Sequence, residues 1–161
     1  IGLLGQQPLL FPHLDVLGNV AYGPRAQRLR RDEARALALE MLERLDAADL
    51  ASRRPGELSG GQAARVALAR ALATRPRAML IDEPFAAVDV EYTPRLRVAV
   101  KAALAEVGCP CIIVTHDPAD VAALADDVAV LDNGRIVEHG PAAEVMARPE
   151  SSFGKLLFTQ K

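Results

Sequence analysis

Two short, continuous apolar runs separated by one helical segment constrain the fold of this chain most strongly. The runs are residues 78–82, AMLID, and residues 111–115, CIIVT. Continuous runs of this length are typical of strands that are covered on both faces. The segment between them predicts a helix over about 94–107, ended by a left-handed cap at Gly108. Strand, helix and strand in this order predict a right-handed parallel crossover, so we expect an α/β fold.

The residues before this unit predict one more strand and two helices. Residues 1–5 are strand-like, and residues 6–15, with two prolines, are typical of a loop. Apolar side chains recur at helical spacing over about 31–46 and again over about 60–75, where Pro76 ends the pattern.

The residues after this unit predict a hairpin and a closing helix. Residues 127–140 contain two short apolar runs joined by Asn133 and Gly134, a pair typical of a tight hairpin turn. Residues 141–147, PAAEVMA, predict a helix that starts at a proline.

Composition and charge limit the classes of function. The chain has 161 residues, half of them apolar, which is enough for the core of one domain. The net charge of -2 does not indicate a nucleic-acid surface. We interpret the basic run at 25–31 as a solvated face because acidic residues follow it at once, with a binding patch as the alternative. Cys109 and Cys111 are too few and too close for a disulfide framework or a four-ligand metal site, so we expect reduced thiols in a cytosolic protein.

The ends and hydropathy of the sequence suggest a soluble segment of a longer chain. No apolar stretch approaches the roughly 18 residues of a membrane span, and no signal peptide opens the sequence. Ile1 is not an initiator methionine, and the first residues read as a strand already under way.

Candidate catalytic side chains follow two of the predicted strands. Ligands of open α/β sheets bind beyond the carboxyl ends of the strands, where Asp82 and Glu83 lie. Two adjacent carboxylates suit a divalent metal ion and a water molecule, although a turn with solvated acids explains the same residues. His116 follows the next strand, where a neutral imidazole could reach a shared ligand, with a purely structural histidine as the alternative.

Ser59, Gly60, Gly61 and Gln62 stand at the start of a predicted helix. Inside a helix each glycine costs roughly 0.5–1 kcal/mol relative to alanine. The serine and glutamine have the spacing of a capping box, which leaves the glycines unexplained. Bare N–H groups at a helix N-terminus bind anions, and glycine lets a phosphate approach closely. The combination therefore indicates a polyphosphate ligand.

LSGGQ at 58–62 resembles the signature motif of ATP-binding-cassette ATPases, the nucleotide-binding subunits of ABC transporters. Gln6 is similar to the Q-loop glutamine, and MLIDEP at 79–84 resembles the Walker B strand. FAAVD at 85–89 resembles the D-loop, and His116 is similar to the switch histidine. The C-terminal residues also resemble this domain, so the resemblance covers nearly the whole chain.

The resemblance implies a role for each matching residue. Asp82 holds Mg²⁺ through water, and Gln6 links this metal ion to the membrane subunit. Glu83 polarises the attacking water, and His116 contacts the γ-phosphate. Asp89 communicates between two active sites.

The resemblance also implies that residues 59–62 close over ATP bound by a second copy, in a head-to-tail homodimer. Three departures from the family pattern suggest tuning of this site rather than its loss. Gly5 replaces a frequent aromatic residue, Ala86 replaces the usual D-loop serine, and Ala63 and Ala64 replace a common glutamine pair.

A P-loop, G-x-x-x-x-G-K-[ST], is required for phosphoryl transfer in this class and is absent from the sequence. In the family this loop precedes the Q-loop. The resemblance thus implies a P-loop NTPase-like α/β fold, of which the chain holds the C-terminal part of a partly parallel sheet with an inserted helical subdomain. We expect about 12–75 to be the helical subdomain and 1–11 with 76–161 to be the catalytic subdomain without its P-loop portion.

The resemblance predicts the ATP-binding subunit of an importer for a small ion or oxyanion, of which molybdate-type importers are the most similar. Its cofactors are ATP and Mg²⁺, and its partners are membrane-spanning permease subunits at the cytoplasmic face of the membrane. We expect the segment alone to be inactive.

Two other functions remain open. One is a non-transport ABC ATPase that acts on DNA or ribosomes, although the short gap between Gln6 and Leu58 leaves no room for a long coiled coil and the acidity does not suit nucleic acid. The other is a non-catalytic interaction module.

Overall fold

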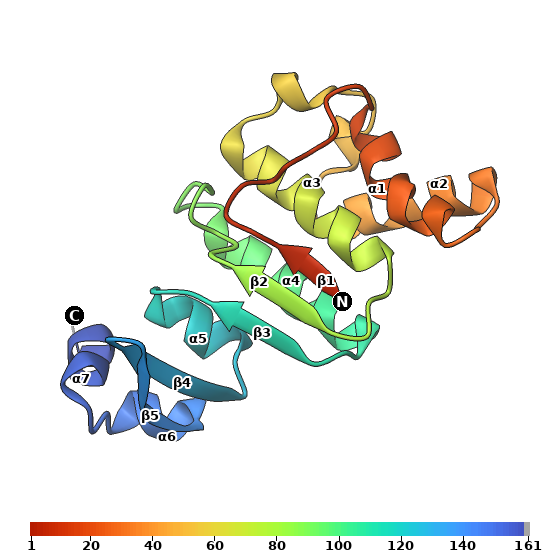
Figure 1. Ribbon diagram of the computed structural model, residues 1–161. Coiled ribbons are helices and arrows are strands. Elements are labelled where there is room, and N and C mark those ends of the chain that lie inside the picture. Colours follow the sequence, from red (N-terminus) through yellow and green to blue (C-terminus); the bar gives the residue numbers. More distant parts are fainter. Residues whose placement is uncertain (160–161) are drawn as a thin grey trace. The chain divides into compact units, whose positions relative to one another are not determined.

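The computed structural model describes residues 1–159, so the last two residues of the expected 76–161 segment lie outside the described part. The chain forms two compact units, Ile1–Val114 and Thr115–Lys161, and each is described by itself. Figure 1 shows the elements along the chain.

A parallel sheet lies at the centre of the first unit. Its strands are β1 (Gly2–Leu4), β2 (Met79–Asp82) and β3 (Cys111–Val114), paired in the order β1-β2-β3. Leu4 pairs with Ile81, and Asp82 pairs with Val114, so the carboxyl ends of the three strands share one edge. The predicted α/β class and parallel crossover are confirmed.

Helix α4 (Thr93–Val107) connects β2 to β3 and lies behind the sheet in Figure 1. Leu96, Val100 and Ala103 recur at helical spacing and are buried. The helix ends as predicted at Gly108, whose φ of 63° places it in the left-handed region and whose N–H donates to the Leu104 carbonyl.

Three helices pack against one another in the first unit: α1 (Val16–Ala26), α2 (Arg31–Arg44) and α3 (Gly60–Ala73). In Figure 1 they lie together above the strands. Two short 3₁₀ turns, Ala48–Leu50 and Pro55–Glu57, lead from α2 to α3. Helices α2 and α3 were predicted, but α1 was not, because it contains Gly18, Gly23 and Pro24, all of which weaken a helix.

The loop before α1 is fixed by a buried asparagine. Asn19 is fully buried, and its side-chain oxygen accepts a 2.7 Å hydrogen bond from the Phe11 N–H while its amide donates to the Phe11 carbonyl. The same amide donates to the Asp15 carbonyl. A buried polar side chain with all these partners stabilises a single loop conformation.

The expectation that the strands are covered on both faces is wrong for the described residues. Leu3, Leu80 and Ile112 lie side by side in the pairing register and are 71%, 39% and 64% exposed. Their strand neighbours Met79 and Ile81 are buried. One face of the sheet is therefore packed, and the other is open and apolar.

Within its described residues, 115–159, the second unit contains a hairpin and three helices. The strands are β4 (Asp127–Asp132) and β5 (Arg135–Pro141), and the helices are α5 (Pro118–Leu124), α6 (Ala142–Ala147) and α7 (Ser152–Thr159). Asn133 and Gly134 have φ of 48° and 75°, so the predicted tight turn is confirmed. The closing helix α6 was also predicted, whereas α5 and α7 were not.

No helix within residues 1–159 is long and apolar enough to cross a membrane.

Candidate functional site

Three of the predicted site residues follow neighbouring strands at the same edge of the sheet. Gln6 comes two residues after β1, Asp82 ends β2, and Glu83 comes directly after it. Because the strands are parallel, these residues share the edge at which ligands of open α/β sheets bind.

The backbone at Glu83 is held in an uncommon conformation. Its φ of 49° lies in the left-handed region, which non-glycine residues rarely adopt. The Glu83 N–H donates a 2.9 Å hydrogen bond to the Val114 carbonyl at the end of β3. Such strained positions persist only where surrounding structure fixes them, and they are enriched at functional sites.

Gln6 and Glu83 line one small cavity of about 20 Å³. Ala64 of α3 and Ala87, four residues after Glu83, complete its lining together with Leu4, Gly5, Pro8 and Pro84. The structure thus brings Gln6, Glu83 and the first turns of α3 together around one cavity.

The start of α3 forms the capping box that the spacing of Ser59 and Gln62 allows. The Ser59 N–H donates to the Gln62 side-chain oxygen at 2.9 Å, and the Gln62 N–H donates to the Ser59 hydroxyl at 3.3 Å. Both residues are engaged in this local structure.

Gly60 and Gly61 pack against the segment that follows Glu83. A Cβ added to Gly61 would lie 3.2 Å from the Ala87 carbonyl oxygen and 3.3 Å from the Val88 Cα. A Cβ added to Gly60 would lie 3.3 Å from the Ala87 Cβ. Close packing against Ala87 and Val88 therefore explains why glycines stand at these two positions. This explanation adds to the phosphate ligand that the sequence suggested.

Asp89 lies at the turn before α4. Its carbonyl accepts hydrogen bonds from the N–H groups of Tyr92 and Thr93 and from the Thr93 hydroxyl. Its side chain is exposed at the end of the 85–89 segment that touches Gly60 and Gly61.

A cluster of Arg65, Tyr92 and Asp46 joins α3 to this turn, and sequence reasoning missed it. Arg65 donates to the Tyr92 hydroxyl at 3.0 Å, and its guanidinium lies 4.6 Å from the centroid of the Tyr92 ring. The Tyr92 hydroxyl donates to the Asp46 carboxylate at 2.5 Å. Arg65 also donates to the Asp46 carbonyl. Partners so distant in sequence leave no local pattern.

Arg70 on α3 holds the loop that carries Gln6, and this role was also missed. Its guanidinium donates 2.9 Å hydrogen bonds to the carbonyls of Pro8 and Leu9 and lies 5.3 Å from the centroid of the Phe11 ring. Partial burial lowers the pKa of Arg70. The sequence contains no local sign of this role, because Pro8 and Leu9 lie 62 and 61 residues away from Arg70.

His116 belongs to the second unit, in the turn between β3 and α5. The Thr115 hydroxyl donates a 2.6 Å hydrogen bond to the buried Asp120 carboxylate and accepts one from the Asp117 N–H. The Asp117 carboxylate caps α5 by accepting from the Ala119 N–H. The neighbours of His116 thus form a tightly bonded turn.

The side-chain oxygens at the sheet edge suit a Mg²⁺ ion whose remaining ligands are water and phosphate oxygens. Asp82 offers a half-buried carboxylate and Gln6 an exposed amide oxygen. Mg²⁺ is usually bound by one or two carboxylates together with water and phosphate oxygens. Among residues 1–159 no three histidines, cysteines or acids lie close enough together to hold a metal ion.

The family model described as ABC transporter matches residues 1–86. The chain belongs to the ABC transporter family. The match includes Gln6, residues 58–62, Asp82 and Glu83.

Similar proteins are ATP-binding subunits of ABC importers. The molybdenum import ATP-binding protein ModC of Mycobacterium tuberculosis H37Rv is 48% identical over 158 residues, which are 96% of this chain and 43% of ModC. The molybdate/tungstate import ATP-binding protein WtpC of Archaeoglobus fulgidus is 44% identical over 98% of this chain and 65% of WtpC. The spermidine/putrescine import ATP-binding protein PotA of Frankia alni is 42% identical over 95% of this chain and 33% of PotA. The chain therefore spans less than two thirds of each of these relatives.

Solved structures of ABC transporter cassettes have the same fold. The dimeric structure of MJ0796, a bacterial ABC transporter cassette, matches 88% of this chain and 62% of that chain with a TM-score of 0.78 and 33% identity. A second dimeric structure of MJ0796, in a post-hydrolysis state bound to ADP and Pi, matches with a TM-score of 0.77.

Proposed function

We propose that the full-length protein is the ATP-binding subunit of an ABC importer, which couples ATP hydrolysis to the uptake of a small solute. The shared cavity of Gln6 and Glu83, beside the contact of Gly61 with Ala87, is the observation that carries this proposal. The names of ModC, WtpC and PotA support the importer assignment.

In this proposal Glu83 polarises the attacking water. Its left-handed backbone and the hydrogen bond of its N–H to the Val114 carbonyl fix the main chain from which this side chain extends at the sheet edge. A fixed group has little to reorganise in the transition state, which is how general bases contribute to catalysis. His116 contacts the γ-phosphate in the same proposal.

Asp82 and Gln6 would hold Mg²⁺, whose chemistry is to neutralise charge that develops on the phosphate oxygens. Residues 59–62 would close over ATP held by a second copy of the protein, in a head-to-tail homodimer. Asp89, at the end of the segment on which Gly61 rests, would connect the two active sites.

The subdomains follow the same scheme. The three packed helices α1 to α3 lie within residues 12–75, which we assign to a helical subdomain. Residues 1–11 and 76–161 belong to the catalytic subdomain. Because the sequence contains no P-loop, the 161-residue chain alone is inactive in this proposal; micromolar ATP affinity of this chain by calorimetry would contradict that part.

The proposed partners are membrane-spanning permease subunits at the cytoplasmic face of the membrane. An inorganic oxyanion such as molybdate is the proposed cargo, since ModC and WtpC carry that substrate in their names. Uptake of molybdate by vesicles with the full transporter, in preference to spermidine or Fe³⁺, tests the cargo.

The variant Glu83→Gln of the full-length protein tests the catalytic assignment. We expect ATP binding to persist and hydrolysis to fall by roughly 100-fold or more. Glu91→Gln is the matched control, since Glu91 is an exposed acid eight residues further along the same segment. Wild-type turnover in Glu83→Gln would remove Glu83 from this role.

A further inference from the structure

One face of α3 packs on residues 87–92 at two successive helical turns. Gly61 and Arg65 are four residues apart on α3, so they lie on the same face. Gly61 contacts Ala87, and Arg65 contacts Tyr92. The start of α3 and the segment that leads into α4 are therefore joined at two points.

The two contacts differ in kind. At Gly61 the backbones meet by close packing, which limits how near the two segments can come. At Arg65 the contact consists of hydrogen bonds: the guanidinium donates to the Tyr92 hydroxyl at 3.0 Å and to the Asp46 carbonyl. Hydrogen bonds depend on angle as well as distance, so the Arg65 contact also fixes how α3 is rotated relative to residues 87–92.

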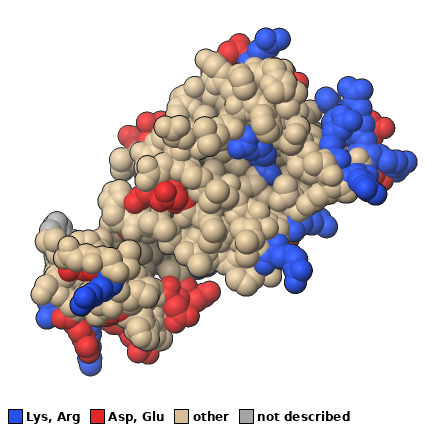
Figure 2. Space-filling view, in the orientation of Figure 1, with Lys and Arg blue, Asp and Glu red and all other residues tan. Residues whose placement is uncertain are grey.

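Arg65 is held in this place rather than solvated. Its side chain is 13% exposed, whereas the side chain of Arg30 in the basic run is 83% exposed. Figure 2 shows basic side chains gathered where α1 leads to α2. A guanidinium that loses its water needs partners in the protein, and Tyr92 and Asp46 supply them.

The third member of the cluster, Asp46, has a backbone that few residues adopt. Its φ of 51° lies in the left-handed region, and its N–H donates a 3.0 Å hydrogen bond to the Glu43 carbonyl near the end of α2. This turn presents the Asp46 carbonyl to Arg65 and the Asp46 carboxylate to Tyr92. The cluster thus ties the end of α2, the first turns of α3 and the start of α4 together.

The proposed function gives the two joined segments different active sites. Residues 59–62, at the start of α3, close over ATP held by a second copy, whereas Glu83 acts on the ATP held by its own chain. The placement of one segment relative to the other therefore affects whether both sites of the homodimer close at once.

We propose that Tyr92 and Arg65 are positioning residues that couple the two active sites of the homodimer. Their hydrogen bond holds the start of α3 at a fixed place relative to the segment that begins at Glu83, so closure at one site favours closure at the other. Neither side chain needs to touch ATP for this role. The inference rests on the proposed function, because that function supplies the second site.

The test uses Tyr92→Phe in the full-length protein, since this change keeps the ring under Arg65 and removes only the hydroxyl. The kcat for ATP hydrolysis should fall about fivefold or more, and the Hill coefficient for ATP should fall toward about 1. The ATP affinity of the monomer should stay within about twofold of the wild type, because the hydroxyl serves dimer closure rather than ATP binding.

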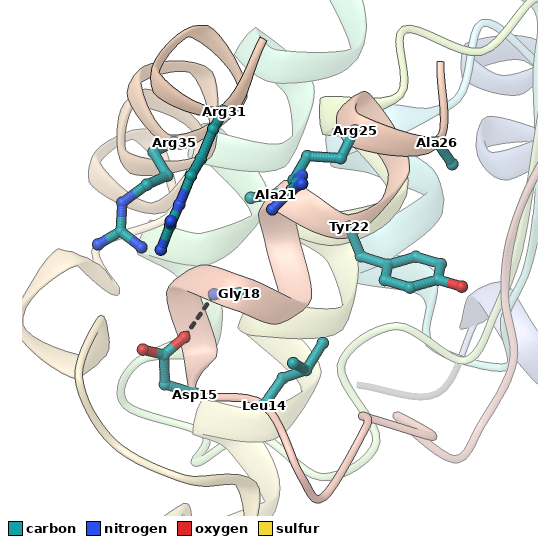
Figure 3. Close-up of a pocket in the computed structure, with 9 residues that line it drawn as sticks. All are labelled: Leu14, Asp15, Gly18, Ala21, Tyr22, Arg25, Ala26, Arg31 and Arg35. Carbon is teal, nitrogen blue, oxygen red and sulfur yellow. Dashed lines mark hydrogen bonds between the residues drawn. The ribbon is translucent and has the colours of Figure 1, made fainter. Parts of the chain in front are cut away.

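Tyr22→Phe is the matched control, since the sequence contains only two tyrosines. Tyr22 on α1 is 53% exposed, and Figure 3 shows its hydroxyl pointing away from the other side chains drawn. Removal of this hydroxyl should leave the kcat and the Hill coefficient within about twofold of the wild type.

A double-mutant cycle on kcat tests whether Tyr92 acts through Arg65. Arg65→Ala alone should lower the kcat at least as much as Tyr92→Phe does. Tyr92→Phe added to Arg65→Ala should then change the kcat by less than about twofold. The assays are run at a temperature at which urea unfolding shows each variant to be folded. Independent, multiplicative losses of kcat would contradict the proposal.

The outcomes separate this inference from the proposed function. If the wild type does not hydrolyse ATP, the proposed function fails and the inference fails with it. If the wild type hydrolyses ATP and Tyr92→Phe keeps its kcat and its Hill coefficient, the coupling role is wrong and the proposed function stands. Equal losses of ATP affinity and kcat in Tyr92→Phe would indicate a purely structural role and overturn the inference.

Discussion

Gly61 rests so closely on Ala87 that a Cβ atom added to Gly61 would lie 3.2 Å from the Ala87 carbonyl oxygen. The start of α3 and the segment after Glu83 therefore touch through bare backbone. A displacement of one of these segments toward the other must move both, because no flexible side chain at the contact can change its rotamer to make room.

The first prediction compares the two glycines. Gly61→Ala should lower the free energy of unfolding by about 1 kcal/mol, because the new methyl group meets the backbone of Ala87 and Val88. Gly60→Ala should change it by less than about 0.5 kcal/mol, because Gly60 is exposed and its nearest neighbour is a side-chain methyl group. Urea unfolding of both variants measures the difference, and equal stabilities would contradict the packing argument.

The second prediction concerns Arg70. Arg70→Ala removes two hydrogen bonds from the loop at Pro8 and Leu9 and the contact with the Phe11 ring. We expect a loss of about 2 kcal/mol of stability and faster hydrogen exchange of the amides in residues 6–11. Arg70→Lys, which retains the charge but not the paired geometry, should give an intermediate result. Unchanged exchange in the loop would mean that Asn19 alone fixes it.

The sequence predicted those elements whose cause is local. Asn133 and Gly134 determine the hairpin turn by their own backbone preferences, and Gly108 ends α4 for the same reason. The parallel crossover followed from two apolar runs and the helix between them.

The sequence did not predict what depends on distant partners. Helix α1 forms despite Gly18 and Pro24 because its apolar side chains, such as Val20, are buried and the helix packs against α2 and α3. Arg65 and Arg70 have the pattern of solvated helix residues, and only the folded chain brings Tyr92 and Pro8 to them. The capping box was predicted at 59–62, but the contact of Gly61 with Ala87 could not be, since no periodicity links the two segments.

The third prediction concerns the hydroxyl of Tyr92. Tyr92→Phe keeps the ring under Arg65 and removes the hydrogen bonds to Asp46 and Arg65. We expect the free energy of unfolding to fall by about 1 kcal/mol at neutral pH. A double-mutant cycle with Asp46→Asn, read by urea unfolding, should give a nonzero coupling energy, and strict additivity would show that the two side chains do not interact.

Tyr92 also predicts a dependence on alkaline pH. Burial first, and then the hydrogen bond to Asp46, raise the pKa of Tyr92 above its ordinary value of 10.0. The folded state therefore favours the neutral phenol. The contribution of this phenol to the free energy of unfolding is complete below pH 10 and is lost as the pH rises through the higher pKa of the folded state. Stability of the wild type should fall more steeply above pH 10 than that of Tyr92→Phe, which lacks this ionisation.

The last prediction concerns the second unit, where Glu138 of β5 fixes the start of α7. The Ser151 hydroxyl donates to the Glu138 carboxylate at 2.6 Å, and the N–H groups of Glu150 and Ser151 donate to it at 2.8 and 3.0 Å. The Ser151 hydrogen bond, followed by the two backbone bonds, lowers the pKa of Glu138.

A lowered pKa means that the carboxylate form stabilises the fold. This contribution is present above the ordinary pKa of 4.5 and is lost as the pH falls through the lower pKa of the folded state. Ser151→Ala removes the largest cause, so the Glu138 pKa should rise toward its ordinary value, and the hydrogen exchange of the α7 amides should accelerate. Carboxyl chemical shifts measured by NMR during an acid titration follow the pKa directly. An unchanged Glu138 pKa in Ser151→Ala would assign the effect to the two backbone N–H groups alone.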